Sequence, residues 1–134
     1  MRFDTKIGIA VRSDLAAWQK LNVTAFLAGG IAVAADDMTG LPYEDGEGNR
    51  YLPLFRQPVL VFAATQEQLA QAHTRALSRD VSTAVYTEEM FKTGNDDDNR
   101  AAVREAAELR LVGLAVHGRR NDVDKVLKAM SLHN

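Results

Sequence analysis

The sequence predicts a three-layer α/β/α fold built on a mixed, four-stranded sheet. Short apolar runs alternate along the chain with segments whose apolar residues recur at helical spacing. The runs at residues 7–11 and 58–63 are continuously apolar, which is typical of central strands buried on both faces. Strands that alternate with helices in this way form one sheet covered by helices on both sides. We therefore expect strands at residues 7–11, 59–62, 81–86 and 111–116.

Helices are predicted after these strands from apolar periodicity and from residues that cap helix N-termini. Side-chain oxygens of Ser, Thr, Asp and Asn can accept hydrogen bonds from the free N–H groups of a first helical turn. A short helix is also expected at residues 101–107. The caps that we expect are Ser13 or Asp14, Asn22 for a second helical stretch, Thr65 paired with Gln68, and Asn121.

Two glycines, Gly29 and Gly30, stand inside the helical stretch that Asn22 begins. Each costs about 1 kcal/mol in helix propensity relative to Ala. Their presence indicates that another backbone or a ligand comes close to the helix there, and close helix packing is the interpretation that we favour.

Two segments are predicted to be irregular. Residues 39–58 carry repeated Gly and Pro, which predict a long connection or an irregular hairpin and make this the segment that we expect to move most. Residues 88–99 are polar and acidic, and we expect a loop there.

Composition indicates one globular domain spanning residues 1–134. Apolar residues make up 46% of the chain and charged residues 25%, which is enough apolar surface for a packed core. There is no cysteine, which excludes disulfides and thiolate metal sites. Neither a signal-peptide-like stretch nor an apolar run of membrane-spanning length occurs, so we expect a cytoplasmic protein that does not enter membranes.

The charge balance predicts weak tRNA binding. The formal net charge is −2, and the charge runs, at residues 36–37, 44–47 and 96–98, are acidic. Proteins that hold nucleic acid through its phosphates usually show a basic excess or stripe. The 16 Lys and Arg residues can still gather on one face after folding, so composition alone does not decide the matter.

Motifs for common cofactors and metals are missing. The chain has no Gly-x-Gly-x-x-Gly, Walker or Gly-x-Ser-x-Gly pattern, and the acidic runs lack EF-hand spacing, so we expect no cofactor and no metal. His73, His117 and His133 have no short ligand spacing. His117 ends the last strand, where ligand crevices often lie, and is otherwise an ordinary loop histidine. Arg119 and Arg120 follow it, either as solvated charges or as a site for phosphate or carboxylate.

Residues 6–15, Lys-Ile-Gly-Ile-Ala-Val-Arg-Ser-Asp-Leu, resemble the first strand and Arg-Thr-Asp-Leu turn of archaeal-type (type II) peptidyl-tRNA hydrolases. Residues 59–69, 82–87 and 111–118 are similar to the later strands of that family, in the same order. The chain also resembles an uncharacterised bacterial family of the same fold, at Trp18, Leu21-Asn22-Val23 and Tyr43 with Asp45-Gly46. The resemblance implies a peptidyl-tRNA hydrolase II-like fold with strand order two, one, four, three. It also implies a homodimer, for which Trp18, Phe55 and Met90 offer contact surface.

The chain departs from the hydrolase motifs at the positions that carry their chemistry. In the hydrolases a lysine follows the Asp-Leu turn and a glutamine comes four residues later. Asn22 and Phe26 stand at these positions, and Lys20 is close but off register. After the third strand the hydrolases have an Asp-Ala-Gly-Arg-Thr motif, for which Glu88 and Thr93 are loose counterparts. A missing ammonium removes attraction for phosphate and stabilisation of an oxyanion, which is worth several kcal/mol.

We therefore expect a domain that binds a small molecule or a protein partner, with its site near the turn after the first strand. Whether the chain is an enzyme stays open, and peptidyl-tRNA hydrolysis is the alternative function. Arg12 and Asp14 fit a structural ion pair and a helix cap as well as they fit a site. The candidate site residues are Arg12, Asp14, Lys20, Asn22, Glu88, Thr93, Asn95 and His117.

Overall fold

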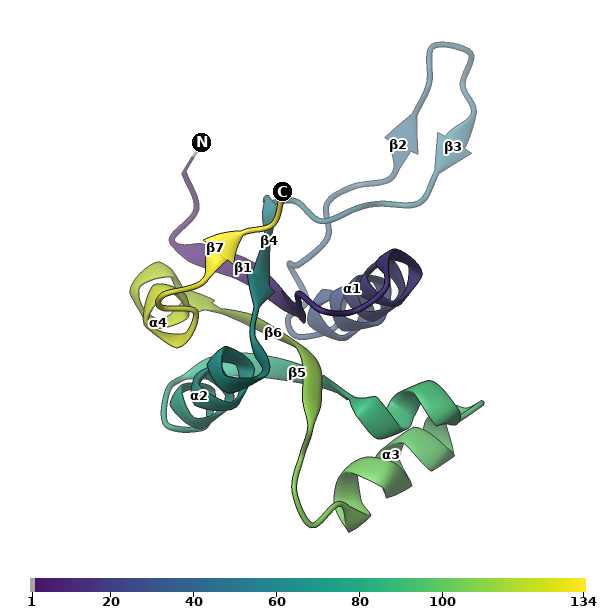
Figure 1. Ribbon diagram of the computed structural model, residues 1–134. Coiled ribbons are helices and arrows are strands. Elements are labelled where there is room, and N and C mark those ends of the chain that lie inside the picture. The colour runs from purple at the N-terminus through teal and green to yellow at the C-terminus, as the bar shows by residue number, and fades with distance from the viewer. Residues whose placement is uncertain (1) are drawn as a thin grey trace.

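A mixed five-stranded sheet forms the centre of the computed structural model, which describes residues 2–134 (Figure 1). Its order is β5-β6-β1-β4-β7, with β1 parallel to β4 and the remaining neighbours antiparallel. The strands are β1 (Thr5–Arg12), β4 (Val59–Ala64), β5 (Val81–Thr87), β6 (Leu111–Arg119) and β7 (Ser131–Leu132).

The α/β class and the order of the four expected strands are confirmed, but the count of four strands was wrong. The fifth strand, β7, pairs its two residues with Phe62 and Ala63 at the edge of the sheet. The chain reaches this edge after a turn in which Ala129 has a positive φ of 70°. Two residues are too few to show an alternating apolar pattern, so the sequence carried no signal for this strand.

Helices cover both faces of the sheet (Figure 1). On one face α1 (Ala17–Ala32) buries Val23, Leu27 and Ile31. On the other face lie α2 (Gln66–Leu77) and α4 (Arg120–Val126). Successive strand residues point to opposite faces, so the buried middles of the central strands, residues 7–11 and 111–116, consist of apolar residues and glycine, as expected. No helix within residues 2–134 is long and apolar enough to cross a membrane.

Several predicted helix starts were wrong. A single helix, α1, begins at Ala17, because the Gln19 side chain accepts a hydrogen bond from the Ala16 N–H at 3.0 Å. Asn22 therefore lies inside α1 and caps nothing. Similarly, Asn121 lies within α4 instead of preceding it. The reciprocal cap of α2 is confirmed, since Thr65 and Gln68 exchange hydrogen bonds of 2.9 and 3.1 Å.

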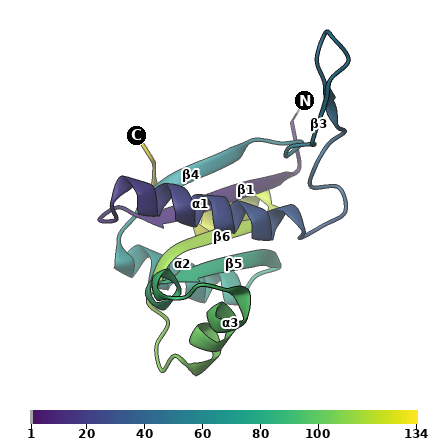
Figure 2. The same ribbon diagram turned by 90° about the vertical axis from the view of Figure 1, so that its right-hand side faces the viewer.

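The acidic segment after β5 is helical instead of a loop. A short 3-10 helix, η1 (Glu88–Lys92), follows β5 directly, and α3 (Asp96–Glu105) comes next. Asn95 caps α3 by accepting a hydrogen bond from the Asp98 N–H at 2.9 Å. The three Asp residues of the first turn lie at the positive end of the helix dipole, where their charge is stabilising. Figure 2 shows α1 and α3 on the same side of the sheet.

Residues 39–58 form the irregular hairpin that the sequence predicted. Its strands, β2 (Tyr43–Glu44) and β3 (Arg50–Tyr51), project away from the sheet (Figures 1 and 2). Asp45 organises the tip by accepting hydrogen bonds from Asn49, from the Tyr51 hydroxyl and from the Glu47 N–H. These bonds, those from Asn49 above all, lower the pKa of Asp45 to about 2.

The two glycines of α1 have different surroundings, which predicts different effects of substitution. A Cβ on Gly30 would lie 3.2 Å from the Ala84 Cβ, whereas one on Gly29 would meet nothing within 4 Å. The expected close approach therefore occurs at Gly30. We expect Gly29→Ala to stabilise the protein by about 0.5–1 kcal/mol and Gly30→Ala to gain less, because Ala84 must give way. Denaturant unfolding measures both, and an equal gain would contradict this packing.

Candidate functional site

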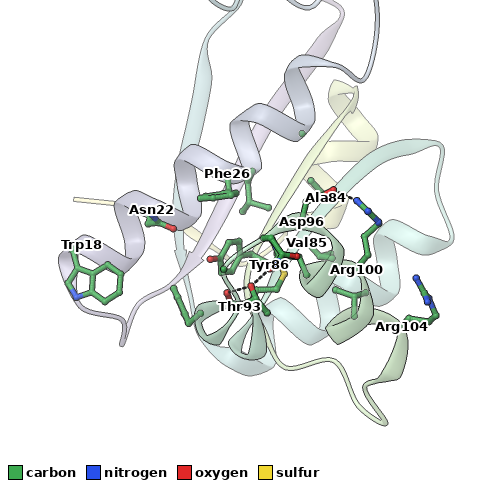
Figure 3. Close-up of a pocket in the computed structure, with 18 residues that line it drawn as sticks. Trp18, Asn22, Phe26, Ala84, Val85, Tyr86, Thr93, Asp96, Arg100 and Arg104 are labelled. Carbon is green, nitrogen blue, oxygen red and sulfur yellow. Dashed lines mark hydrogen bonds and ion pairs between the residues drawn. The ribbon is translucent and has the colours of Figure 1, made fainter.

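A groove with a volume of about 830 Å³ opens between α1, the end of β5 and the η1–α3 segment (Figure 3). Its apolar wall is largely aromatic, and polar side chains of α1 and α3 stand beside it. The aromatic residues are Trp18, Phe26, Tyr86 and Phe91. The polar residues that matter below are Asn22, Thr93, Asn95, Asp96, Asn99 and Arg100.

One stripe of α1 forms a whole side of the groove. Trp18, Asn22, Phe26 and Gly30 follow each other at four-residue spacing, which places them on one helix face. At Gly30 the helix backbone approaches Ala84 of β5, so the groove is closed at that end. Toward Trp18 the stripe carries large side chains, and Trp18 and Phe26 remain 63% and 56% exposed. The stripe therefore presents aromatic surface to the solvent inside a concavity.

The four aromatic rings form one continuous chain of contacts. Trp18 meets Phe91 with ring centroids 6.2 Å apart, Phe91 meets Tyr86 at 5.2 Å, and Tyr86 meets Phe26 at 5.8 Å. The rings are tilted or edge-to-face, and such contacts contribute about 0.5–1.5 kcal/mol each beyond area burial. Tyr86 lies deepest, and burial raises its pKa. The chain thus ties α1, β5 and η1 together.

Polar side chains hold the opposite wall in place. The Thr93 hydroxyl donates to the Met90 carbonyl at 2.9 Å and also contacts the Asn99 side chain, which joins η1 to α3. Arg100 pairs with Asp96 and Asp97 within α3. Thr93 and Asn95, both expected at the site, therefore line the groove while serving as structural ties.

Arg12 forms a clamp between the end of β1 and the start of η1. Its Nε donates to Asp14 and its Nη1 donates to Glu88, both at 2.6 Å. The Arg12 side chain is only 14% exposed. Burial opposes its charge, but the hydrogen bonds to Glu88 and Asp14 outweigh burial and raise the Arg12 pKa. Because Glu88 begins η1, the clamp fixes the segment that supplies Met90 and Phe91 to the groove.

A family model described as protein of unknown function, DUF2000, matches residues 5–134. The chain belongs to the DUF2000 family. A solved structure of a protein of unknown function, Atu0240 from Agrobacterium tumefaciens strain C58, is 47% identical, with a TM-score of 0.95. The match covers 99% of this chain and 100% of that one. No curated protein matched. The expected membership of an uncharacterised family is confirmed, whereas the hydrolase resemblance stays a prediction from sequence.

The candidate residues of this DUF2000 chain fall into two neighbouring groups and two outliers. Lys20 and His117 do not join the others. Lys20 Nζ lies 3.2 Å from His133 Nε2, near the C-terminus. His117 pairs with Ile7 in the β1–β6 register, which places it about 17 Å along the sheet from the Arg12 end of β1. The clamp contains Arg12, Asp14 and Glu88, and the groove contains Asn22, Thr93 and Asn95.

The aromatic chain was missed as a site by the sequence reasoning. Trp18 and Met90 were assigned only to a dimer surface, and Tyr86 and Phe91 had no assigned role. The four-residue spacing of Trp18, Asn22 and Phe26 was a usable signal, since it places them on one helix face. Tyr86 and Phe91 belong to a strand end and a 3-10 helix, whose relation to α1 no local pattern reveals.

The remaining polar clusters of the DUF2000 chain lie outside the groove. Within residues 2–134, no three His, Asp or Glu side chains are gathered so that they could hold a metal ion. Arg119 and Arg120 line a second cavity of about 900 Å³ at the opposite end of the sheet, together with Arg2. Asp4 and Asp122 line it too, so acidic side chains offset part of its positive charge.

The Arg12 clamp predicts that two substitutions, one in the clamp and one beside it, lower the free energy of unfolding by different amounts. Arg12→Ala removes both ion pairs and leaves the partly buried Glu88 alone, so we expect a loss of about 1–3 kcal/mol in unfolding free energy. Lys92→Ala in the same η1 segment is the control, since the Lys92–Glu89 pair is 3.9 Å long and exposed, and its loss should cost under about 1 kcal/mol. Urea unfolding compares them, and similar small losses would show that the clamp does not hold η1.

Proposed function

We propose that this chain is a binding domain whose groove between α1 and η1–α3 takes a small organic molecule. The observation that carries the proposal is the chain of four aromatic rings inside the groove, of which Trp18 and Phe26 are more than half exposed. Ligand sites are typically concave and mostly apolar, with a few placed polar groups and volumes of about 300–1,000 Å³. The single-domain organisation and cytoplasmic location expected from the sequence are part of this proposal.

The groove is preformed, which favours binding. The Arg12 clamp fixes the start of η1, the Thr93 hydroxyl fixes its end, and Asn95 fixes the first turn of α3. A site whose walls are already held in place loses less conformational entropy when a ligand enters.

Trp18 gives a direct test, because it is the sole tryptophan of the chain. We expect the dye 8-anilinonaphthalene-1-sulfonate to bind in the groove, to quench Trp18 fluorescence and to receive energy from it. Phe26→Ala should weaken dye binding about tenfold, because it removes an exposed ring of the wall. Leu77→Ala is the matched control, since Leu77 is 72% exposed on α2, on the other face. Equal effects of the two variants would refute binding in the groove.

Native mass spectrometry of the purified protein adds an unbiased search for the natural ligand. A bound small molecule that is lost from Phe26→Ala but retained by Leu77→Ala would identify it. A ligand that both variants retain would lie elsewhere and would count against the groove.

Peptidyl-tRNA hydrolysis is the alternative function, and one observation favours considering it at the same groove. Asn22 and Phe26, which fall where the resemblance puts the lysine and glutamine of the hydrolases, both line the groove. Lys20, the nearest ammonium in sequence, is turned toward His133 instead. We therefore expect no turnover of peptidyl-tRNA and weak tRNA binding. Turnover at the rate of an authentic hydrolase would put this activity first.

We also propose that the chain forms a homodimer. Of the three residues expected at such a surface, Trp18 is exposed, whereas Phe55 and Met90 pack partly against the core. The hairpin and its flanks offer a larger apolar surface, since Leu41, Tyr43, Tyr51, Leu52 and Leu54 are each more than half exposed. We expect sedimentation at micromolar concentration to give a dimer mass and Leu52→Asp to give a monomer. A monomer mass for the unsubstituted protein would remove the idea.

A further inference from the structure

We infer that the ligand of the groove is a planar aromatic heterocycle of the nucleobase type, with a hydrogen-bond donor next to an acceptor on its edge, and that Asn22 binds this edge. The inference rests on the proposed function and names the chemistry of its ligand. It follows from the placement of one carboxamide between two exposed aromatic rings.

The Asn22 carboxamide is exposed in the groove and has no hydrogen-bond partner among the described residues, 2–134. Other polar side chains of α1 bond to the chain itself: Gln19 accepts from Ala16, Lys20 meets His133 and the Thr24 hydroxyl donates to the Lys20 carbonyl. Among residues 2–134, by contrast, no hydrogen bond to the Asn22 side chain is formed. Asn is also a less favourable residue than Ala or Leu within a helix, so helix propensity does not account for it there.

A carboxamide presents an N–H donor and a C=O acceptor side by side, in one plane. It therefore matches a ring edge that carries an acceptor and a donor as neighbours, and it binds such an edge through two hydrogen bonds, as Asn does with adenine. A purely apolar ligand would leave both groups unpaired, and an isolated anion would meet the carbonyl oxygen as well as the amide. The side chain thus selects for a heterocycle.

The neighbours of Asn22 supply the faces that such a ring needs. Trp18 lies one turn before Asn22 and Phe26 one turn after it, and all three point into the groove (Figure 3). Stacking of a nucleobase on an aromatic side chain contributes about 1–3 kcal/mol. Edge contact at Asn22 and face contact at Trp18 or Phe26 are compatible, because they use different parts of a planar ring.

The test compares adenosine with purine riboside, which lacks the exocyclic amino donor, using Trp18 fluorescence and calorimetry. We expect adenosine to bind about tenfold or more tightly than purine riboside. Asn22→Leu, which keeps the number and branching of the side-chain heavy atoms, should weaken adenosine binding about tenfold or more and make the two ligands equal. Leu21→Asn is the control, since it places a carboxamide on the exposed neighbour outside the groove.

The outcomes separate this inference from the proposed function. Cytidine, guanosine and uridine complete the panel, because their ring edges also carry neighbouring donors and acceptors. Two results would refute the heterocycle as ligand while leaving the groove as the binding site: dye binding that depends on Phe26 without binding of any nucleoside, or nucleoside binding that Asn22→Leu leaves unchanged. If dye binding is also insensitive to Phe26, the groove itself is wrong. Urea unfolding of Asn22→Leu, with Asn22→Ala as a second variant, confirms that a loss of binding is not a loss of folding.

Discussion

The close packing of α1 on the sheet is the constraint on which the groove depends. A Cβ on Gly113 of β6 would lie 2.5 Å from the Val23 side chain, so only glycine lets α1 sit this deep at its middle. Near its C-terminal end, Gly30 brings the helix against Ala84 of β5. Two contacts on two neighbouring strands fix the direction of the helix axis. Because η1 follows directly from the end of β5, it lies beside the N-terminal half of α1, and the space between them becomes the groove.

The aromatic chain shows how stability and binding share the same residues. Tyr86 is nearly buried and contributes to the core, yet its ring touches Phe26 and Phe91 in the groove. Leaving a large apolar side chain exposed forgoes about 1.5–3 kcal/mol of burial. The exposed ring of Trp18 contacts Phe91 at its edge but is otherwise largely uncovered. An uncovered aromatic wall suits the planar ligand that we propose. Burial of apolar side chains in the core beneath the wall supplies the stability that the exposed rings do not.

The sequence predicted the sheet well because strands buried on both faces leave continuous apolar runs. It could not predict β7, which has two residues, or the helix at Asp96, because a run of like charges resembles a solvated loop until a helix dipole stabilises it. The candidate site was predicted in part. Arg12 ends β1 and Glu88 follows β5, and in the predicted strand order only β6 lies between these two strands. In the structure the two side chains form an ion pair. His117 was misplaced because the antiparallel register of β6 carries it to the far end of the sheet.

The ion pairs of the Arg12 clamp lie beside the groove and not in it, and this arrangement bears on the function that the groove can have. A hydrolytic site stabilises charge that develops on the reacting atoms, through cations or through neutral hydrogen-bond donors. Here the guanidinium of Arg12 is committed to Asp14 and Glu88, and that of Arg100 is committed to acidic residues of its own helix. Arg104 also lines the groove and forms no ion pair among residues 2–134. What the groove leaves unpaired on α1 is a neutral carboxamide flanked by aromatic rings. Neutral hydrogen-bonding groups and ring faces select a ligand by shape and by pairing, which is the basis of the binding function that we propose.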